Sequence, residues 1–417
     1  MRYAKYKPTN IPWLPEVPET WEVAKVRQYF RLRSEKVSEK DYPALSVAKI
    51  GVVPQLSDVA ISMAEGDSRK LVREGDFVVN SRSDRKGSCG IAPRDGSVTT
   101  ISIVLEPRRI NHKYVHYLFR SVPWVEEFYR NGRGIVADLW TTRYQEMRNM
   151  LFPLPPLAEQ KRIVAYLDEK CAKIDTLVTA KTKQIELFKE LRQSIIAEAV
   201  TKGIDGCKTF KPTNIPWLPE VPETWEVKRA GAFLSVKDAQ SAPNEQLLSV
   251  FLDRGVIPFS AGGEKRANAT SKDLSKYQLV EPGDLVMNNQ QAWRGSVGVS
   301  QYLGIVSPAY FVVKMNNDVD PLYANFAFRS RPFVSVYEIC SRGVGSIQRN
   351  LIWNSFKGQP FPLPPLAEQK RIVAYLDKKC AKIDTLVAKI EDEVVKLKEY
   401  RERLVADVVT GQRKVVK

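Results

Sequence analysis

The sequence predicts a mixed α/β protein in which two similar globular domains are separated by two long antiparallel coiled-coil helices. Two blocks that each occur twice in the chain predict this fold. Residues 7–23 (KPTNIPWLPEVPETWEV) are identical to residues 211–227, and residues 152–178 match residues 361–387 at every position but one. The first pair is offset by 204 residues and the second by 209, so the chain is an internal pseudo-twofold tandem repeat with a slightly longer second copy.

The repeat defines the order of the elements. We expect the proline- and tryptophan-rich blocks, residues 7–23 and 211–227, to lie extended, because proline disrupts a regular helix. They are called the leading segments below. By pseudo-symmetry, the end of the second helix should lie near the first leading segment. The expected regions are a first domain (residues 1–151), a central helix (152–205), a second domain (206–360) and a C-terminal helix that pairs with the central one (361–417).

Between the repeated blocks the two halves diverge but keep a common skeleton. Gly75-Asp76, followed by an apolar run to Asn80, matches Gly283-Asp284 running to Asn288. Shorter matches are Leu45-Ser46-Val47 with Leu248-Ser249-Val250, and the Gly-Ser pairs at 87–88 and 295–296. One fold with two different surfaces explains this pattern. Recombination that homogenised the flanking blocks is an alternative explanation of their identity.

Heptad patterns predict the two helices. A seam of apolar residues that recurs over more than four heptads is typical of a coiled coil. Gly203 and Gly411 are the expected stops, which gives helices of about 45 residues, or roughly 65–70 Å. A helix of this length overreaches a domain of about 130 residues, so we expect the helices to pack on each other. The expected seam is Ile163, Leu167, Ile174, Leu177, Phe188, Leu191 and Ile195 in the first helix, widened by Val164, Val178 and Ile185, and Ile372, Leu376, Ile383, Leu386, Ile390, Leu397, Tyr400 and Leu404 in the second. Cys171 and Cys380 are expected to be buried at its edge.

The composition is that of a globular protein with a polyanionic partner. The 417 residues suffice for two to four domains, and 43% of them are apolar. Lys and Arg outnumber Asp and Glu by 64 to 48, and the formal net charge is +16. Residues 24–151 hold 22 basic and 15 acidic side chains, and residues 228–360 hold 15 and 10, so the diverged regions carry +7 and +5. This shared excess favours nucleic acid as the common partner.

Several classes of protein are disfavoured by what the sequence lacks. No window reaches the roughly 18 consecutive apolar residues of a membrane helix, and the N-terminal residues lack the apolar core of a signal peptide. The five cysteines include no C-x-x-C pair, which fits a reducing cytoplasm. There is no phosphate-binding loop and no G-x-G-x-x-G cofactor loop. We expect a cytoplasmic protein without catalytic activity or a bound cofactor.

The two histidines could be a metal pair. His112 and His116 are four residues apart, which would place both on one face of a helix. The apolar neighbours favour an ordinary amphipathic helix instead, and no third ligand stands out. We therefore expect no metal site.

A polar loop at matching positions of the two halves is the strongest candidate for a binding surface. It follows an apolar strand in each half and is rich in the side chains that read base edges, namely Arg for guanine and Asn or Gln for adenine. A polar loop without a target is the alternative. The candidate residues are Asn80, Arg82, Arg85 and Lys86 in the first half and Asn288, Asn289, Gln290, Trp293 and Arg294 in the second.

Two further sets of basic residues are candidates for contact with DNA. Lys49 and the Gly-rich run that contains Lys265 and Arg266 could approach a DNA backbone closely. Arg130, Arg133 and Arg342 lie beside glycine turns and are expected to contact phosphates rather than bases.

Taken together, these features resemble the specificity subunit of a type I restriction-modification enzyme over essentially the whole chain. The resemblance depends on the duplicated PLPPLAEQKRIVAYLD…IDTLV helices (Pro153–Val178 and Pro362–Val387), the duplicated leading segments, and the Gly-Asp…Asn…Gly-Ser skeleton of each diverged domain. The doubled helix start is highly specific, whereas the skeleton alone would be weak.

The resemblance implies a partner for each surface. Such subunits carry two target-recognition domains that each read one half of a bipartite, asymmetric duplex site. Their helices bind two modification subunits, which methylate adenine with S-adenosylmethionine, and restriction subunits add ATP-dependent cleavage. The alternatives are a stand-alone, repressor-like DNA-binding protein and a nuclease or methyltransferase in one chain; the missing cofactor loops count against the latter.

Overall fold

The fold is seen in a computed structural model, which describes residues 2–55, 68–134, 140–206, 209–237, 242, 244–252, 254–262, 273–343 and 349–415. The chain forms two compact units. The first comprises Met1–Thr182 and Asp392–Lys417, and the second Lys183–Glu391. Among the described residues, none of the helices combines the length and apolarity needed to cross a membrane.

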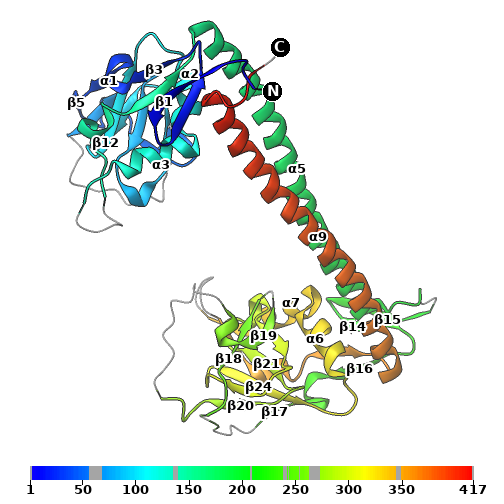
Figure 1. The fold of residues 1–417 in the computed structure, drawn as a ribbon. Helices are drawn as coiled ribbons and strands as arrows, with labels where there is room; N and C mark the ends of the chain where they lie inside the picture. The colour runs from blue at the N-terminus through cyan, green and yellow to red at the C-terminus, as the bar shows by residue number, and fades with distance from the viewer. Residues whose placement is uncertain are drawn as a thin grey trace. The chain divides into compact units, whose positions relative to one another are not determined.

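The first unit begins with a globular domain (Figure 1). Its elements are β1 (Tyr6–Ile11), β2 (Leu14–Pro18), β3 (Glu22–Lys25), α1 (Val26–Tyr29), β4 (Phe30–Arg33), β5 (Lys36–Val37), β6 (Leu45–Ala48), β7 (Gly51–Pro54), β8 (Arg69–Val72), β9 (Phe77–Asn80), η1 (Ser83–Arg85), β10 (Cys89–Ile91), β11 (Gly96–Val98), β12 (Ser102–Pro107), α2 (His112–Phe119), α3 (Val122–Arg130), α4 (Tyr144–Met147) and β13 (Leu151–Leu154).

The second domain repeats this order. Its elements are β14 (Phe210–Ile215), β15 (Leu218–Pro222), β16 (Glu226–Arg229), η3 (Ala230–Ala232), β17 (Leu234–Val236), β18 (Leu248–Phe251), β19 (Gly255–Pro258), η4 (Phe259–Gly262), β20 (Gln278–Val280), β21 (Leu285–Asn288), η5 (Ala292–Arg294), β22 (Val297–Val299), β23 (Gly304–Val306), β24 (Tyr310–Met315), α6 (Pro321–Arg329), α7 (Arg331–Ile339), β25 (Ser341–Arg342), β26 (Asn350–Leu351), α8 (Trp353–Phe356) and β27 (Pro360–Leu363). The long helices are α5 (Leu157–Lys202) and α9 (Leu366–Val409).

Each domain is built on the same four-stranded antiparallel sheet. The strand order is β10-β9-β12-β4 in the first domain and β22-β21-β24-β17 in the second. Alternate apolar residues of the strands face two hydrophobic cores in each domain. The larger core also includes side chains of the helices. In the first domain the rings of Trp124 and Phe119 stack there, with their centroids 4.1 Å apart. The predicted mixed α/β fold with two similar domains is confirmed.

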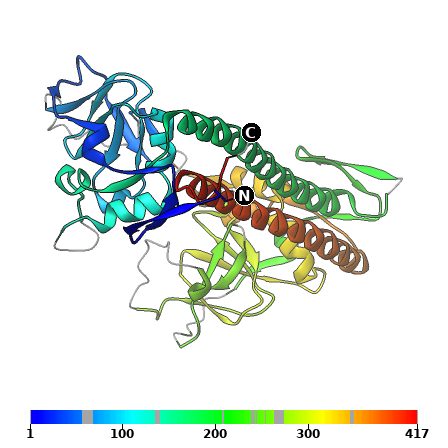
Figure 2. The same cartoon turned by 45° about the horizontal axis from the view of Figure 1, so that its top comes forward.

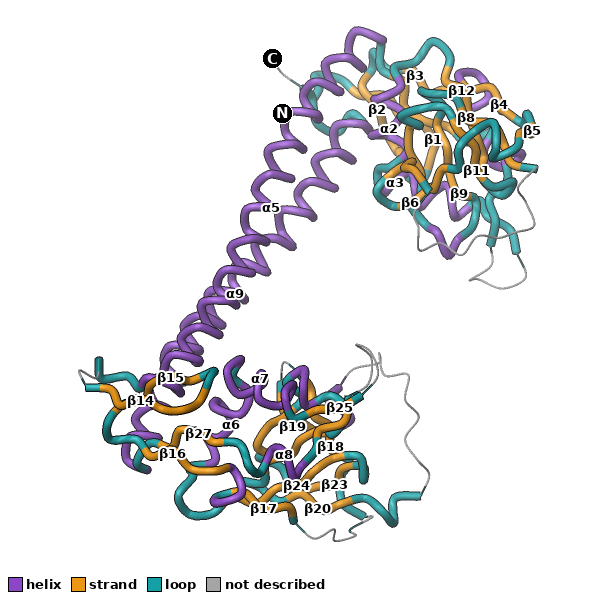
Figure 3. Tube along the Cα trace, turned by 180° about the vertical axis from the view of Figure 1, so that it is seen from behind, coloured by secondary structure: helices purple, strands orange, loops and turns teal. Residues whose placement is uncertain are grey.

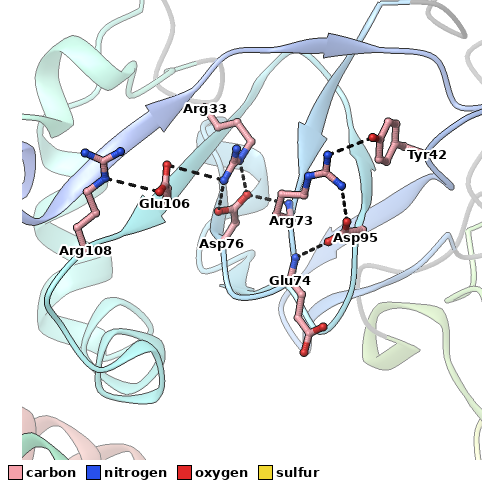
Figure 4. A network of polar contacts seen from close by, with 8 residues as sticks. All are labelled: Arg33, Tyr42, Arg73, Glu74, Asp76, Asp95, Glu106 and Arg108. Atoms are coloured by element: carbon pink, nitrogen blue, oxygen red, sulfur yellow. Dashed lines mark hydrogen bonds and ion pairs between the residues drawn. The ribbon is translucent and has the colours of Figure 1, made fainter.

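The Gly-Asp pairs of the common skeleton are buried structural elements. The Asp76 carboxylate is 2% exposed and accepts two hydrogen bonds from the Arg33 guanidinium, at 2.7 and 3.1 Å, and one from the backbone N–H of Arg73 (Figure 4). Asp284 is 6% exposed and accepts from Lys237 Nζ at 3.0 Å and from the backbone N–H of Glu281. A buried carboxylate needs such a paired cation, so these aspartates fix the turn before the central strand.

Within each unit, one half of α5 lies antiparallel to one half of α9, as the views agree (Figures 2 and 3). In the first unit Asp175 forms an ion pair with Arg401 at 2.9 Å, and in the second Arg192 pairs with Asp384 at 3.0 Å. These two pairs are equivalent under the 209-residue offset of the repeat. The predicted antiparallel pairing is therefore confirmed.

The predicted seam was right in one row of residues and wrong in the other. Leu376, Ile383, Ile390 and Leu404 are buried as predicted, and so are Cys171 and Cys380. The companion row lies one residue further along each helix than Leu177 and Leu386, and in α5 it contains Val164 and Val178, which were predicted to widen the seam. The predicted seam residues that are instead exposed are Leu177, Leu191, Leu386 and Tyr400, and the second row is formed by Val164, Cys171 and Val178 in α5 and by Val373, Cys380, Val387 and Val394 in α9. A two-helix seam covers only a narrow stripe, so a shift of one residue moves a side chain out of it.

The leading segments form β-hairpins, which agrees with their predicted extended conformation. In the first unit the end of α9 packs on the first hairpin, because Val408 and Val409 share a core with Trp21, and Tyr6 donates a hydrogen bond to the Gly411 carbonyl at 2.9 Å. In the second unit the end of α5 shares a core with Trp225. Both helices stop before glycines with positive φ, Gly203 (+77°) and Gly411 (+78°), as predicted.

Candidate nucleic-acid interface

In each domain two chain segments join into one surface, called the platform below. The first segment is the predicted polar loop, residues 80–87 or 288–295, called the reading loop. The second, called the adjoining segment, consists of the described residues 131–134 and 140–142 in the first domain and 340–343 and 349–351 in the second. In the sequence, the polar loop and the arginines of the adjoining segment are separate candidates, and the structure brings them together.

Backbone hydrogen bonds hold the platform in the same register in both domains. In the first, the N–H of Thr142 donates to the carbonyl of Ser81 at 3.0 Å, and the N–H of Ser83 donates to the carbonyl of Trp140 at 2.9 Å. In the second, the N–H of Leu351 donates to the carbonyl of Asn289 at 3.0 Å. Position 142 matches 351 and position 81 matches 289, so the two platforms share one backbone design.

The predicted asparagines at the start of each loop shape its backbone. Asn80 Oδ1 accepts a hydrogen bond from the N–H of Arg82, and Asn288 Oδ1 accepts from the N–H of Gln290, both at 3.1 Å. This is the local turn that asparagine favours. In the first domain the Tyr129 hydroxyl also donates to the carbonyls of Asn80 and Arg85. Burial raises the pKa of Tyr129, so the hydroxyl remains a donor at neutral pH.

The first platform is charged. Asp84 accepts two hydrogen bonds from the Arg82 guanidinium, at 3.0 and 3.1 Å, which fixes the plane of that group. The side chain of Arg85 is 67% exposed, and Lys86 pairs with Glu126 at 2.6 Å. A guanidinium that is held by a carboxylate still presents N–H groups to solvent, which is the geometry that reads guanine.

The second platform is centred on an indole ring. The guanidinium of Arg294 lies 4.6 Å from the ring centre of Trp293, and that of Arg349 lies 5.0 Å from it. Trp293 Nε1 donates to the carbonyl of Gln290 at 3.1 Å, which fixes the ring, and the Gln290 side chain is exposed. The Asn289 side-chain oxygen is buried without a hydrogen-bond partner among the described residues.

The remaining predicted residues lie around these platforms. Arg133 and Arg342 occupy matching positions in the adjoining segments, and the Arg133 side chain is 85% exposed. Arg130 pairs with Glu127 at 3.3 Å. Lys49, in the turn between β6 and β7, lines a surface cavity of about 400 Å³ together with Gly87 of the reading loop. Lys265 and Arg266 lie outside the described residues.

His116 has a structural role. His116 Nδ1 accepts a weak hydrogen bond from the N–H of Ile91 at 3.4 Å, and Asn325 Oδ1 accepts from Val299 at the matching place in the second domain. Burial, together with the charge of Arg120, lowers the pKa of His116 to about 4, so its ring is neutral. Among the described residues, no group of three or more His, Cys, Asp or Glu side chains could hold a metal ion.

Trp140 and Arg349 belong to the platforms but were not predicted from the sequence. They lie on the far side of the adjoining segments, about 55 to 60 residues from the loops in the chain (140 minus 85, and 349 minus 290). Their contact with the loops depends on the fold. An alignment of the two halves could have drawn attention to them, because they occupy the same position of the repeat.

Two domains of one fold, each carrying the same backbone platform with different side chains, define a duplicated recognition protein. The chain belongs to the family described as the type I restriction modification DNA specificity domain, whose model matches residues 18–187 and 222–396. It is a specificity subunit of a type I restriction-modification system, and it takes part in DNA recognition. The resemblance noted in the sequence is thereby confirmed.

Individual relatives cover nearly the whole chain. The type I restriction enzyme MjaVIII specificity subunit of Methanocaldococcus jannaschii is 25% identical over 96% of this chain and 94% of its own length. The EcoKI specificity subunit of Escherichia coli is 23% identical, with coverages of 95% and 90%.

Solved structures share the fold. A chain from the structure described as "Structural basis underlying complex assembly and conformational transition of the type I R-M system" is similar with a TM-score of 0.66, at 17% identity, and covers 94% of this chain and 98% of its own. The HsdS subunit from Thermoanaerobacter tengcongensis gives a TM-score of 0.50, at 19% identity, with coverages of 95% and 98%.

Proposed function

We propose that the chain reads a bipartite, asymmetric site in double-stranded DNA, with one domain for each half-site. The observation that carries this proposal is the contrast between identical and diverged parts of the repeat. The leading segments are identical and share one role in packing, whereas the two platforms keep one backbone and differ in almost every side chain. Two half-sites of different sequence would require this difference. The domains that act as readers are residues 24–151 and 228–360.

The side chains of each platform divide into two roles. Arg82 and Arg85 in the first domain, and Asn289, Gln290 and Arg294 in the second, read base edges in the major groove. Lys49, Lys86, Arg133 and Arg342 contact phosphates and set the register of the protein on the duplex. Lys265 and Arg266 are further candidate DNA contacts in the second half-site, and only the sequence supports them.

We further propose that the chain is not itself an enzyme and serves as the scaffold for two modification subunits and for restriction subunits. The support is a surface that is repeated rather than diverged. Leu177 and Leu386 are equivalent residues of the two long helices, and they are 50% and 37% exposed. Apolar side chains exposed at equivalent positions of identical sequence suit two copies of one partner. Methylation and cleavage would then take place in the partners, in the cytoplasm.

Selection from a pool of random duplexes tests the recognition proposal. The full chain, assembled with its modification partner, should enrich two short conserved blocks separated by a spacer of fixed length and free sequence. If about eight phosphates are neutralised, log K should fall against log[salt] with a slope near −7. Enrichment of a single block, or a slope shallower than about −3, would contradict the bipartite reading. Tight binding to a defined site without any partner would instead favour a repressor-like protein.

Single substitutions in the reading loops test the assignment of the base-reading residues. Arg82→Ala or Arg85→Ala should relax only the first block, and Asn289→Ala, Gln290→Ala or Arg294→Ala only the second. Loss of a bidentate base contact costs about 1–3 kcal/mol, or roughly 5- to 150-fold in preference. Unchanged preference in all five variants would mean that other residues read the bases.

The mass of the assembled complex tests the scaffold proposal. Leu177→Glu and Leu386→Glu each place a charge on one of the two equivalent exposed faces. Each single variant should lose one modification subunit and the double variant both, while Thr179→Glu, a neighbouring exposed position of α5, is the control. A double variant that still assembles with two subunits would rule these faces out as docking surfaces.

A further inference from the structure

Three matched positions differ together between the two platforms. At the first, Arg85 in the reading loop corresponds to Trp293. At the second, Trp140 in the adjoining segment corresponds to Arg349, so that one tryptophan and one arginine have exchanged segments. The third position lies at the end of the preceding helix, where Tyr129 corresponds to Glu338.

The third position follows the exchange in its contacts. In the first domain the Tyr129 hydroxyl donates to the backbone of the reading loop, at Asn80 and Arg85. In the second domain Glu338 Oε1 instead accepts a hydrogen bond from Arg349 Nη1 at 3.1 Å. The residue behind the platform therefore supports the reading loop in one domain and the adjoining segment in the other.

Two contacts restrain the Arg349 guanidinium. Its Cζ atom lies over the Trp293 ring, 5.0 Å from the ring centre, and Nη1 donates a hydrogen bond to Glu338. The side chain is nevertheless 31% exposed. A cation–π contact with an indole uses the face of a guanidinium, whereas its five N–H donors lie on the edge of the group. Two N–H groups in one plane match the O6 and N7 acceptors of guanine, a pairing that lysine cannot make.

We propose that Arg349 is a specificity-determining residue that reads a guanine in the second half-site, and that Trp293 is the positioning residue that holds it. This inference rests on the proposed function and extends the reading surface from the loop to the adjoining segment. In the first domain the order is reversed in the sequence, with the arginine, Arg85, in the reading loop and the tryptophan, Trp140, in the adjoining segment. Trp140 is 38% exposed and determines preference in the first half-site.

Base preference at each position of the two half-sites tests the proposal in the full chain assembled with its modification partner. Arg349→Ala should reduce discrimination for one guanine of the second block by roughly 5- to 150-fold. Arg349→Lys should lose a similar amount, since the charge remains but the planar fork does not. Arg229→Ala removes an exposed arginine from strand β16 of the same domain and should leave every base preference unchanged.

The role of Trp293 is tested by coupling. Trp293→Phe should retain most of the preference at that base pair, because it keeps a ring under the guanidinium, and Trp293→Ala should lose part of it. At that base pair, the double variant Trp293→Ala with Arg349→Ala should discriminate no worse than Arg349→Ala alone, because the ring acts there through Arg349. Melting temperatures of all variants show whether the domain is folded. In the first domain, Trp140→Ala should alter only the first block.

The outcomes separate this inference from the proposed function. If the wild-type complex enriches two blocks while Arg349→Ala keeps its preference at every position, the inference is wrong and the proposed function stands. Weaker binding to all sequences without a change in preference would make Arg349 a phosphate contact and would also overturn the inference. If the wild-type complex enriches no second block, the proposed function itself fails.

Discussion

The two platforms share a backbone and differ in how their arginines are held. In the first domain a carboxylate in the same loop, Asp84, fixes the Arg82 guanidinium by two hydrogen bonds. In the second domain an indole, Trp293, lies against the guanidiniums of Arg294 and Arg349. The backbone that the two platforms share therefore depends on a few residues, among them Asn80 and Asn288 at the start of the loops and the buried Asp76 and Asp284. The other side chains are free to change without altering the loop.

The largest effect is expected from exchanging a whole domain. Replacement of residues 24–151 by the matching region of a relative should change the first recognised block completely and leave the second intact. Specific sites are typically bound 10³–10⁷ times more tightly than other sequences, so the original first block should lose at least about 10³-fold in binding. Selection from random duplexes measures both blocks at once. Loss of both blocks from a folded, assembled chimera would show that the domains do not read independently.

Substituting the buried aspartates compares how much each of them stabilises its own domain. Asp76→Ala removes two hydrogen bonds to the Arg33 guanidinium, which keeps only Glu106, at 3.8 Å, and should cost about 3 kcal/mol of local stability. Asp284→Ala should cost somewhat less, about 2 kcal/mol, because it removes one hydrogen bond to Lys237, which keeps Glu281 at 2.5 Å. Hydrogen exchange of the amides in β9 and β21 reports each domain separately.

An exposed ion pair provides the control for this comparison. Asp95 pairs with Arg73, and both side chains are more than 40% exposed. Asp95→Ala should cost clearly less than Asp76→Ala, because water screens an exposed ion pair. If Asp76→Ala cost no more than this control, the buried aspartate would not be a structural element of the frame.

Acid should destabilise the first domain through His116, which the second domain replaces with Asn325. The folded-state pKa of His116 is about 4 and its ordinary value is 6.5, so the unfolded chain takes up the proton first. The stability that the neutral ring contributes is complete above pH 6.5 and is lost as the pH falls towards 4. At most about 3 kcal/mol is involved. His116→Asn should flatten this dependence, measured by hydrogen exchange of β9 and β10 between pH 7 and 4.5; an unchanged slope would exclude His116 as its source.

The smallest effect is expected where the two platforms are alike. Arg133→Ala and Arg342→Ala each remove one proposed phosphate contact at matching positions. Each should weaken binding to all sequences about equally and reduce the magnitude of the salt slope by about 1. Titrations at several salt concentrations with specific and unrelated duplexes measure both quantities. A change in base preference for either variant would make that arginine a reader.

The fold could be predicted from the sequence because its main signals are local. The identical blocks define the repeat, and the heptads define the helices. The error in the seam arose at Leu177, Leu191, Leu386 and Tyr400. Rows of apolar residues three and four positions from the main row are both compatible with a heptad, and only the partner helix decides which row it covers. Arg192 and Arg401 continue the row of Val178 and Val394, and arginine gave no apolar signal there.

The platforms could be predicted only in part. The reading loops stood out because strand, asparagine and glycine recur at fixed spacing around polar residues. Arg349 and Trp140 did not, because their place beside the loops is set by backbone hydrogen bonds between segments far apart in the chain. The exchange of Trp and Arg could be recognised as meaningful only once the two segments were known to be neighbours.

The reciprocal ion pairs of the long helices have a consequence for the origin of the chain. Asp175 pairs with Arg401 and Arg192 pairs with Asp384. Each half of the repeat therefore carries one acidic and one basic residue that pair with the other half. A protein of half this length would therefore be self-complementary: in an isologous dimer, Asp175 of each copy could meet Arg192 of the other. Such a dimer would recognise a palindromic site. Fusion of two copies releases each domain to evolve alone, and an asymmetric target then becomes accessible without any change in the scaffold.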